Sequence, residues 1–455
     1  MIRYSLKNDL KSILKLGTPL LAGSLSGYFL QLADTIMVGR LGTESLAAIA
    51  IAGLLTSIFF VLAWPITVGT QTIASRRYGR ETLDSSLSPA TGEILLHSFS
   101  VGIAFGLTSF FLAFFSKPLL TLLLKDQKLI ALALSYINII RWVFPLVGLY
   151  ASMTGFLSAV NRTSVIMVAT LSSDLLNILF NYILIFGKLG FPAMGIRGAA
   201  LGTILAQSIG FIYLILYIAL SREMKRYHAL KRRKLKPELL WGIVRFSLPV
   251  MIQNFFALAI ILIYESIIGN IGAIYLAVTH IVFSIFRINK TIVGGLARGA
   301  AILVGNSLGR REEEHATHYI LACELIALVI GIVVMGVTLI FPGSVIRIFN
   351  GDAATILTGI KALHFFAAFF FIEIMGFSFE MIFTHNGWGK YVLFSEFTTN
   401  VLFILGTTLL TVKVLGTGIY GAWLGFALYQ VFHALILTGG FLSKRWLLIK
   451  VEHEG

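Results

Sequence analysis

The sequence predicts an all-α membrane protein of about twelve transmembrane helices, arranged as two parallel-related six-helix bundles. One observation behind this prediction is the composition, which is 57% hydrophobic and only 13% charged. Soluble globular domains carry about 25% charged residues, so the composition excludes an ordinary soluble protein. The other observations are the recurrent apolar runs and an internal duplication of the chain.

Apolar runs recur along the whole length with short polar interruptions, and each is long enough to cross about 30 Å of hydrocarbon. We expect every run to be helical, because hydrocarbon offers backbone groups no partner and no alternating segments suggest a barrel. The expected spans are 13–38, 45–72, 92–115, 130–157, 163–187, 196–220, 243–268, 273–304, 316–342, 356–385, 391–412 and 418–442.

The first apolar run follows a basic start and continues to Val38 with no small-residue cleavage site. It is therefore expected to be the first helix and not a signal peptide. With the N-terminus inside, the inner loops and tails carry more than twice as many Lys and Arg residues as the outer loops. The positive-inside rule then places both termini in the cytoplasm.

The net charge is +15, and the densest basic cluster lies in one segment, residues 221–240, between the sixth and seventh runs. We interpret this segment as a topology signal and a link between two halves, and not as a nucleic-acid site. Its basic residues are Arg222, Lys225, Arg226, Lys231, Arg232, Arg233, Lys234 and Lys236.

The chain matches itself at two fixed offsets, which indicates an internal duplication. At an offset of 230 the matching pairs include Pro19 and Pro249, Gly39 and Gly269, Gly42 and Gly272, and Gly69 and Gly299. At an offset of 223 they include Asn177 and Asn400, Gly195 and Gly418, and Gln207 and Gln430. The expected organisation is an N-terminal six-helix lobe at 1–220, a basic cytoplasmic linker at 221–240 and a C-terminal six-helix lobe at 241–455.

Six helices are an even number, so both halves start and end in the cytoplasm and are parallel repeats. Such repeats around a central site are typical of transporters that work by alternating access. The sequence has no phosphate-binding loop of the Gly-x-x-x-x-Gly-Lys-Ser/Thr type, no His-Glu-x-x-His and no Gly-x-Ser-x-Gly. We therefore expect a secondary transporter and not an enzyme or an ATP-driven pump, with no cofactor.

Asp34 is an acid within the first run, near its outer end. Ionisable residues in membrane helices usually face the bundle interior and mark ion or proton pathways. Such a carboxylate can cycle between protonated and ionised states, or bind Na+ through its oxygens. The alternative is an interfacial acid, solvated near the headgroups.

Asn177 and Asn181 are four residues apart in the fifth run, so both face one side of a helix. Their amide oxygens could coordinate a cation or pair with Asp34, but packing between helices is an equally good explanation. Thr203, in the sixth run, is a weaker candidate on spacing alone.

The second half carries several charges within its runs. Arg287, Lys290, Gly294 and Arg298 form one stripe by helical spacing. Glu265 lies in the seventh run, and Glu373 and Glu380 share a face of the tenth. Two interpretations remain open: a structural network of opposite charges, or a charged wall of a transport cavity with Glu373 or Glu380 as a second coupling site.

Three stretches together resemble the multidrug and toxic compound extrusion (MATE) family, bacterial type. They are Gly17-Thr-Pro-Leu20 leading to Ala33-Asp-Thr-Ile-Met-Val-Gly39, Leu176-Asn-Ile-Leu-Phe-Asn181, and Gly195-Ile-Arg-Gly-Ala-Ala-Leu-Gly-Thr203. The segment Gly418-Ile-Tyr-Gly-Ala-Trp-Leu-Gly425 also fits, and the resemblance covers nearly the whole chain.

The resemblance assigns roles to particular residues. Asp34 matches the acidic cation-coupling residue of the family, with Asn177 and Thr203 matching its polar neighbours. Asn181 falls where some relatives have aspartate, which leaves H+ and Na+ both open as the coupling ion. Pro19 matches a proline associated with bending of the first helix, although it could be only a packing kink.

The resemblance implies a secondary antiporter of the cytoplasmic (inner) membrane, driven by H+ or Na+, that exports amphipathic, often cationic compounds. The expected partners are a small-molecule substrate and membrane lipids, and a monomer is expected. The alternative is a flippase for lipid-linked anionic precursors, with Arg287, Lys290 and Arg298 holding phosphate.

Overall fold

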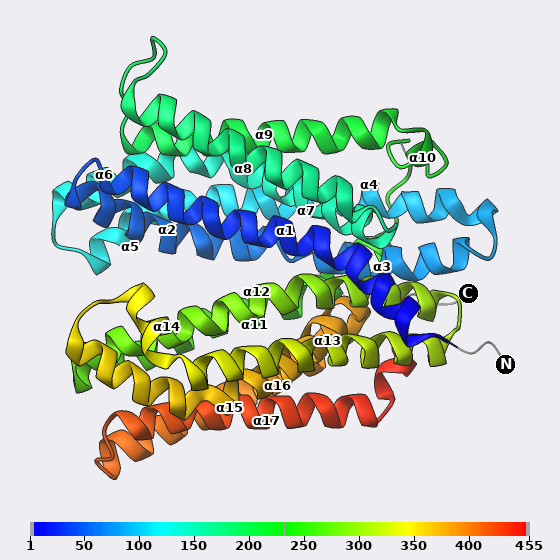
Figure 1. The fold of residues 1–455 in the computed structure, drawn as a ribbon. Helices are drawn as coiled ribbons and strands as arrows, with labels where there is room; N and C mark the ends of the chain where they lie inside the picture. The colour runs from blue at the N-terminus through cyan, green and yellow to red at the C-terminus, as the bar shows by residue number, and fades with distance from the viewer. Residues whose placement is uncertain (1–3, 232, 452–455) are drawn as a thin grey trace. The chain divides into compact units, whose positions relative to one another are not determined.

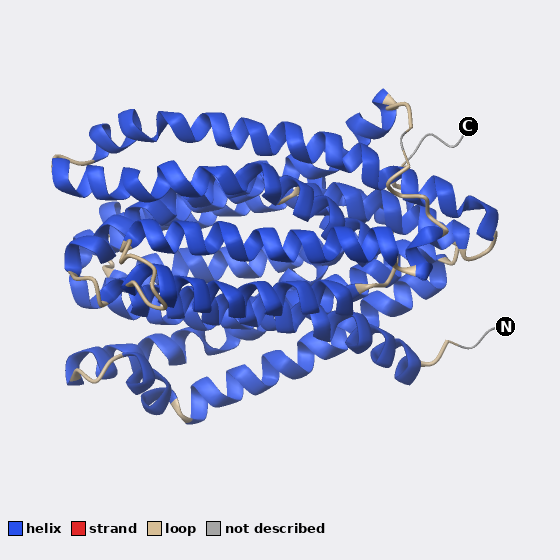
Figure 2. Cartoon of the chain, turned by 90° about the horizontal axis from the view of Figure 1, so that it is seen from above, coloured by secondary structure: helices blue, strands red, loops and turns tan. Residues whose placement is uncertain are grey.

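Every regular element in the part of the chain that this computed structural model describes, residues 4–231 and 233–451, is helical (Figure 1). Figure 2 shows the helices in blue with short tan connections between them. The all-α membrane architecture expected from the sequence is therefore confirmed.

The first half of the chain contains ten α-helices, counted over the described residues. They are α1 (Leu6–Gly39), α2 (Thr43–Ala63), α3 (Ile66–Glu81), α4 (Ser88–Leu112), α5 (Ser116–Leu123), α6 (Gln127–Ile140), α7 (Phe144–Ala159), α8 (Thr163–Phe186), α9 (Ile196–Leu220) and α10 (Arg222–Lys225). Short 3₁₀ turns lie at η1 (Ser85–Leu87), η2 (Ala113–Phe115) and η3 (Arg141–Val143).

The second half has longer helices and three π-helical segments. Its α-helices are α11 (Pro237–Ile271), α12 (Ala273–Gly309), α13 (Glu313–Ile340), α14 (Pro342–Phe349), α15 (Ala353–Phe383), α16 (Gly389–Thr399) and α17 (Ile419–Leu442). The π-helical segments are η4 (Thr384–Trp388), η5 (Asn400–Thr407) and η6 (Leu409–Val414), and a 3₁₀ turn, η7, spans Arg445–Leu448.

Helix starts follow ordinary capping chemistry. The Asp126 side chain accepts hydrogen bonds from the backbone N–H groups of Lys128 and Leu129 at the start of α6. Asp352 does the same for Thr355 at the start of α15. Each cap satisfies a backbone donor that lacks a partner inside its helix, so these acids serve local structure.

Within the described residues, eleven helical segments are long and apolar enough to cross a membrane. One of them runs from Ala353 to Val414 and is 62 residues long, which is too long for a single crossing. It is interrupted at Asn386 and Gly387, whose backbone angles are not helical. Gly387 has φ +94°, a conformation that favours glycine. Division at this kink gives twelve crossings, as the sequence predicted.

The chain packs as two compact units, whose boundaries fall inside α1 and α11. Among the described residues, the N-unit comprises Ala22–Met251 and Val451, and the C-unit comprises the chain up to Leu21 with Ile252–Lys450. The two internal boundaries are separated by the repeat offset of 230, and each lies two residues after Pro19 or Pro249. The first helix of each half therefore contributes to both units.

Close contacts at glycine residues hold the first part of α1 and the first part of α11. In the C-unit, a Cβ at Gly299 of α12 would lie 2.6 Å from the Gly17 nitrogen and 3.0 Å from the Ile13 oxygen of α1. In the N-unit, a Cβ at Gly69 of α3 would overlap the Ile243 carbonyl of α11. The two glycines and the two isoleucines are each related by the offset of 230. Absence of a side chain thus permits both close helix contacts.

The duplication extends to backbone conformation. Gly195 precedes α9 with φ 54° and ψ −133°, and Gly418 precedes α17 with φ 63° and ψ −144°. These angles are essentially restricted to glycine. The matching glycines therefore mark a turn that both repeats require.

Several residues of the basic linker are fixed by ion pairs within the N-unit. Arg226 pairs with Glu81 at 3.3 Å, and Lys236 pairs with Glu93 at 2.9 Å. The linker residue Arg232 lies outside the described residues. These pairs fit a linker that docks on the first half.

We predict that Gly69→Ala and Gly299→Ala each lower the unfolding temperature of the purified protein in detergent. The three atoms nearest the new methyl group are all backbone atoms at Gly299, and at Gly69 they are the Ile243 carbonyl and the Ser247 hydroxyl. Backbone atoms cannot rotate away, so each variant should lose about 1–3 kcal/mol. Gly53→Ala in α2 is the control, because a Cβ there meets nothing within 4 Å. Unchanged melting of both variants would contradict the packing described above.

Candidate functional site

A polar cluster in the N-unit brings together side chains from three helices. Asp34 comes from α1, Asn177 and Asn181 from α8, and Thr203 from α9. Helices α8 and α9 lie side by side (Figure 1). Their approach is close at Gly202, where a Cβ would overlap the Asn181 Oδ1 atom. The four residues that the sequence and the family resemblance singled out are thus neighbours in space.

The hydrogen bonds of this cluster run outward from the Asn181 amide in two directions. Asn181 Nδ2 donates to Asp34 Oδ1 at 2.7 Å and to Asn177 Oδ1 at 2.7 Å. Asn177 Nδ2 donates to Thr203 Oγ1 at 3.1 Å, and the Thr203 hydroxyl donates to the Ala199 carbonyl at 3.0 Å. One branch ends on the Asp34 carboxylate and the other on the Ala199 carbonyl, so a change of charge at Asp34 alters one of the two bonds that Asn181 donates.

Burial differs along the cluster. Asn177 and Asn181 are 2% and 0% exposed, whereas Asp34 is partly exposed. Asn181 Oδ1 is buried and has no hydrogen-bond partner among the described residues. The amide groups are therefore fixed, while the carboxylate remains accessible to an ion or proton.

Asp174 is a further acid of this site that the sequence reasoning missed. It lies on α8 one turn before Asn177, on the face shared with Asn181. Its charge is close enough to interact with that of Asp34, and its side chain hydrogen-bonds to Ser26. An acid within the apolar fifth run was the signal that could have found it.

The second-half charges divide into three separate environments. Lys290 Nζ lies 3.2 Å from Glu373 Oε1, and its charge also interacts with Glu380. Glu265 instead faces His280, at 3.5 Å, and Arg287 is exposed. The stripe of helical spacing therefore does not act as one unit. Lys290 and Glu373 form the opposite-charge pair that a structural network would require.

Glu380 belongs to a larger buried polar cluster of the C-unit. Gln253 Nε2 donates to Glu380 Oε1 at 2.7 Å, and His433 Nε2 lies 3.4 Å from Glu380 Oε2. Glu396 lies on the other side of the same histidine, at 3.8 Å. Sequence spacing did not bring out Glu396 and His433 as partners of Glu380, because they are far apart along the chain.

The second half has no copy of the Asp34 site. Tyr264 occupies the position of Asp34 at the offset of 230, and its hydroxyl donates to the Ala422 carbonyl at 2.9 Å. Phe426 occupies the position of Thr203 at the offset of 223, and the rings of Tyr264 and Phe426 lie 5.9 Å apart. An apolar, aromatic core takes the place of Asp34, Asn181 and Thr203 there, whereas Asn177 has an asparagine, Asn400, as its counterpart.

An internally duplicated bundle of membrane-spanning helices, with buried acids on several of them, defines the class of secondary transporters. The sequence matches the MatE family over residues 19–183 and 249–409, and the chain belongs to this family. The resemblance to the MATE family is thereby confirmed, and the chain is a transporter and not an enzyme.

Relatives of similar sequence include two proteins described as "probable multidrug resistance protein NorM". The one from Agrobacterium fabrum is 28% identical over 302 residues, which cover 66% of this chain and 64% of the relative. The one from Thermotoga maritima is 24% identical over 469 residues, with 98% and 97% of the two chains covered.

Solved structures confirm the fold. The crystal structure of MATE in the bent conformation matches with a TM-score of 0.87 and 22% identity, and covers 97% of this chain and 96% of that chain. A MOP superfamily transporter from Pyrococcus furiosus matches with a TM-score of 0.86, 22% identity and 97% of both chains. The twelve-helix architecture is therefore that of MATE transporters.

We predict that Gly202→Ala impairs transport without unfolding the protein. The added methyl group meets the far end of the Asn181 side chain, which can rotate and so leave Asp34. Misplacement of this order should lower dye efflux from cells by about tenfold. Gly27→Ala on α1 is the control, because a Cβ there meets nothing within 4 Å. Normal efflux by Gly202→Ala at matched membrane levels would refute this role of Asn181.

A second prediction concerns the pair of Lys290 and Glu373. Lys290→Met leaves the buried Glu373 carboxylate without its partner, which typically costs about 3–5 kcal/mol. We expect the lower end of this range, because 33% of the Lys290 side chain is exposed. The double variant Lys290→Met/Glu373→Gln should recover most of the loss in a thermal unfolding assay.

The control for this pair is Lys128→Met, which removes an exposed ion pair with Glu44. Such pairs contribute about 0–1 kcal/mol, so this variant should melt close to the wild-type temperature. If the double variant melts as early as Lys290→Met, charge pairing is not the reason for the loss.

Proposed function

We propose that this protein is a proton-driven antiporter that exports amphipathic, cationic compounds across the cytoplasmic membrane by alternating access. Membership of the MatE family and the names of its multidrug-resistance relatives support export. The hydrogen bond that Asn181 donates to the Asp34 carboxylate is the observation that carries the coupling role. The charge distribution of the loops supports a cytoplasmic location for both termini.

The geometry of the cluster favours H+ over Na+. A sodium ion needs oxygen atoms that converge on it, but the Asn181 amide nitrogen lies within 2.7 Å of both Asp34 Oδ1 and Asn177 Oδ1. Two N–H donors therefore already occupy the space between the oxygens. A proton needs only one free carboxylate oxygen, and the partly exposed Asp34 provides it.

Protonation would change the link between α1 and α8. The ionised carboxylate of Asp34 accepts a charge-assisted bond from Asn181, which is about twice as strong as a neutral one. Proton uptake removes this advantage and alters the relative stability of the two transporter conformations. An ion shifts the equilibrium between two conformations only if it binds to one of them more strongly than to the other.

The lobes of this mechanism are the two halves, 1–220 and 241–455, joined by the linker at 221–240. Helix α1 runs without interruption from the C-unit, up to Leu21, into the N-unit that holds Asp34. A shift of α1 at Asp34 is therefore transmitted through its own backbone. Bending would occur near Pro19, where one backbone hydrogen bond is missing.

The flippase alternative receives less support from the second-half charges. Phosphate recognition needs cations that are free to bind an anion, yet Lys290 is paired with Glu373 and also faces Glu380. Arg287 is exposed. A cationic substrate fits the acidic character of these clusters better.

We predict that Asp34→Asn abolishes gradient-driven export while the protein still folds and inserts. The test is flux of a cationic dye in proteoliposomes, with H+ and Na+ gradients imposed separately. Wild-type flux should follow the H+ gradient. Glu44→Gln, an acid-to-amide change at an exposed site, is the matched control and should transport normally.

Undiminished export by Asp34→Asn would refute the coupling role of this residue. Wild-type flux that follows only the Na+ gradient would refute the proton assignment and leave antiport intact. Flux that depends on neither gradient would refute antiport itself.

A further inference from the structure

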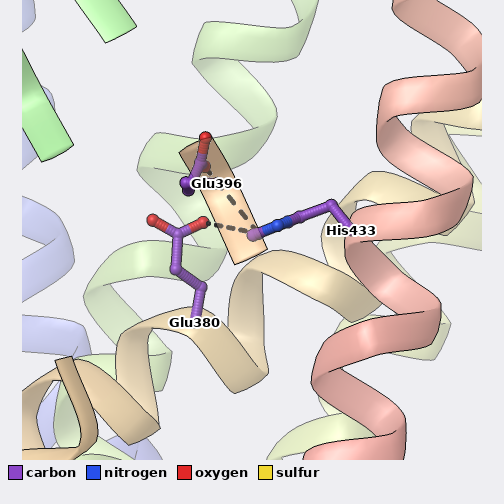
Figure 3. A group of neighbouring side chains, drawn as sticks. All are labelled: Glu380, Glu396 and His433. Atoms are coloured by element: carbon purple, nitrogen blue, oxygen red, sulfur yellow. Dashed lines mark hydrogen bonds and ion pairs between the residues drawn. The ribbon is translucent and has the colours of Figure 1, made fainter. Parts of the chain in front are cut away.

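Three buried side chains of the C-unit converge from three helical segments, which lie on both sides of the kink at Asn386 and Gly387. Glu380 belongs to α15, Glu396 to α16 and His433 to α17. One ligand atom from each lies within 4.8 Å of the other two. Figure 3 shows the His433 ring directed between the two carboxylates. We propose that these residues form a binding site for a divalent cation of the Zn2+ type.

The distances favour a shared metal ion over direct hydrogen bonds. His433 Nε2 lies 3.4 Å from Glu380 Oε2 and 3.8 Å from Glu396 Oε1. A charge-assisted hydrogen bond between such groups would be about 2.7–2.9 Å long. Ligand atoms at about 2.1 Å from a tetrahedral ion are separated by about 3.4 Å. The observed spacing is therefore close to that of two ligands on one ion.

Neighbouring groups orient all three ligands. His433 Nδ1 is hydrogen-bonded to the Ser395 hydroxyl at 2.9 Å, which leaves Nε2 for the site. The Tyr429 hydroxyl donates to Glu396 Oε1 at 3.0 Å, and Gln253 donates to Glu380 Oε1. Metal-ligating histidines and carboxylates are typically held by such outer partners.

The charge of the cluster also favours a bound cation. Glu373, Glu380 and Glu396 are all buried, and Lys290 is a cation whose charge interacts with all three. With neutral His433, these four charged groups have a net charge of about −2, which is costly in a low-dielectric interior. Glu373 Oε2 in addition is buried and has no hydrogen-bond partner in the described chain. One divalent ion would neutralise the net charge of these four residues.

The ligand types select the class of ion. Ca2+ and Mg2+ prefer shells made only of oxygen, whereas an imidazole with carboxylates suits Zn2+, Co2+, Ni2+ and related ions. Three protein ligands leave a fourth position open, as in exchangeable zinc sites. The ion would tie the segments before and after the kink to α17.

The test uses the full-length protein in detergent, with its affinity tag removed, and Co2+ as a spectroscopic probe. Wild-type protein should bind one Co2+ per chain with ligand-field absorption, and Zn2+ should displace it. His433→Ala should lower the affinity by at least about tenfold, and Ser395→Ala by about 10- to 100-fold. His280→Ala, which alters another Glu–His pair of this half, should bind as the wild type does.

Ser395→Ala keeps the test decisive if His433→Ala does not fold, because it removes only a buried hydroxyl next to the ligand. Absence of the absorption bands in the wild type would overturn the proposal. Equal Co2+ binding by the wild type, His433→Ala and Ser395→Ala would also overturn it, since the ion would then lie elsewhere. Neither result would bear on the export function of Asp34.

Discussion

Hydrocarbon offers no hydrogen-bond partner to a peptide group, and most features of this transporter follow from that constraint. The backbone groups find their hydrogen-bond partners within helices, so the crossings are helical. Polar side chains meet this constraint by pairing across helices, as Asn181 of α8 does with Asp34 of α1 and Gln253 of α11 with Glu380 of α15. Because each pairing fixes two helices in register, a change of charge at one partner acts on helix packing.

The two halves satisfy this constraint with different chemistry at equivalent positions. Asn177 in the first half is bonded to Asn181 and Thr203, whereas its counterpart Asn400 donates to the Glu396 carboxylate. The position of Asp34 is taken by Tyr264, which needs only a backbone carbonyl as partner. Duplication thus preserved the helix frame, while each half acquired a separate buried polar cluster. Separate clusters permit separate ion chemistry in the two halves.

Sequence reasoning was sufficient for the helices and for part of the N-unit cluster, for physical reasons. Apolar length alone determines a membrane crossing, and residues four apart on one helix, such as Asn177 and Asn181, must share a face. Asp174 could have been found by the same helical spacing, but it was missed. Convergence of Glu380, Glu396 and His433 depends on how three helical segments pack around a kink, and spacing along the chain does not encode it.

The placement of unit boundaries inside α1 and α11 connects packing with transport. A continuous helix resists sharp bending because each backbone hydrogen bond would have to stretch, and proline removes one such bond. Pro19 and Pro249 lie two residues before these boundaries, so bending is least costly there. Asp34 is about 22 Å further along α1 than Pro19, at about 1.5 Å per residue. The same helix therefore carries the proposed coupling acid in one unit and the close glycine packing in the other, and its stiffness between Pro19 and Asp34 is what would let a local change in charge act at a distance.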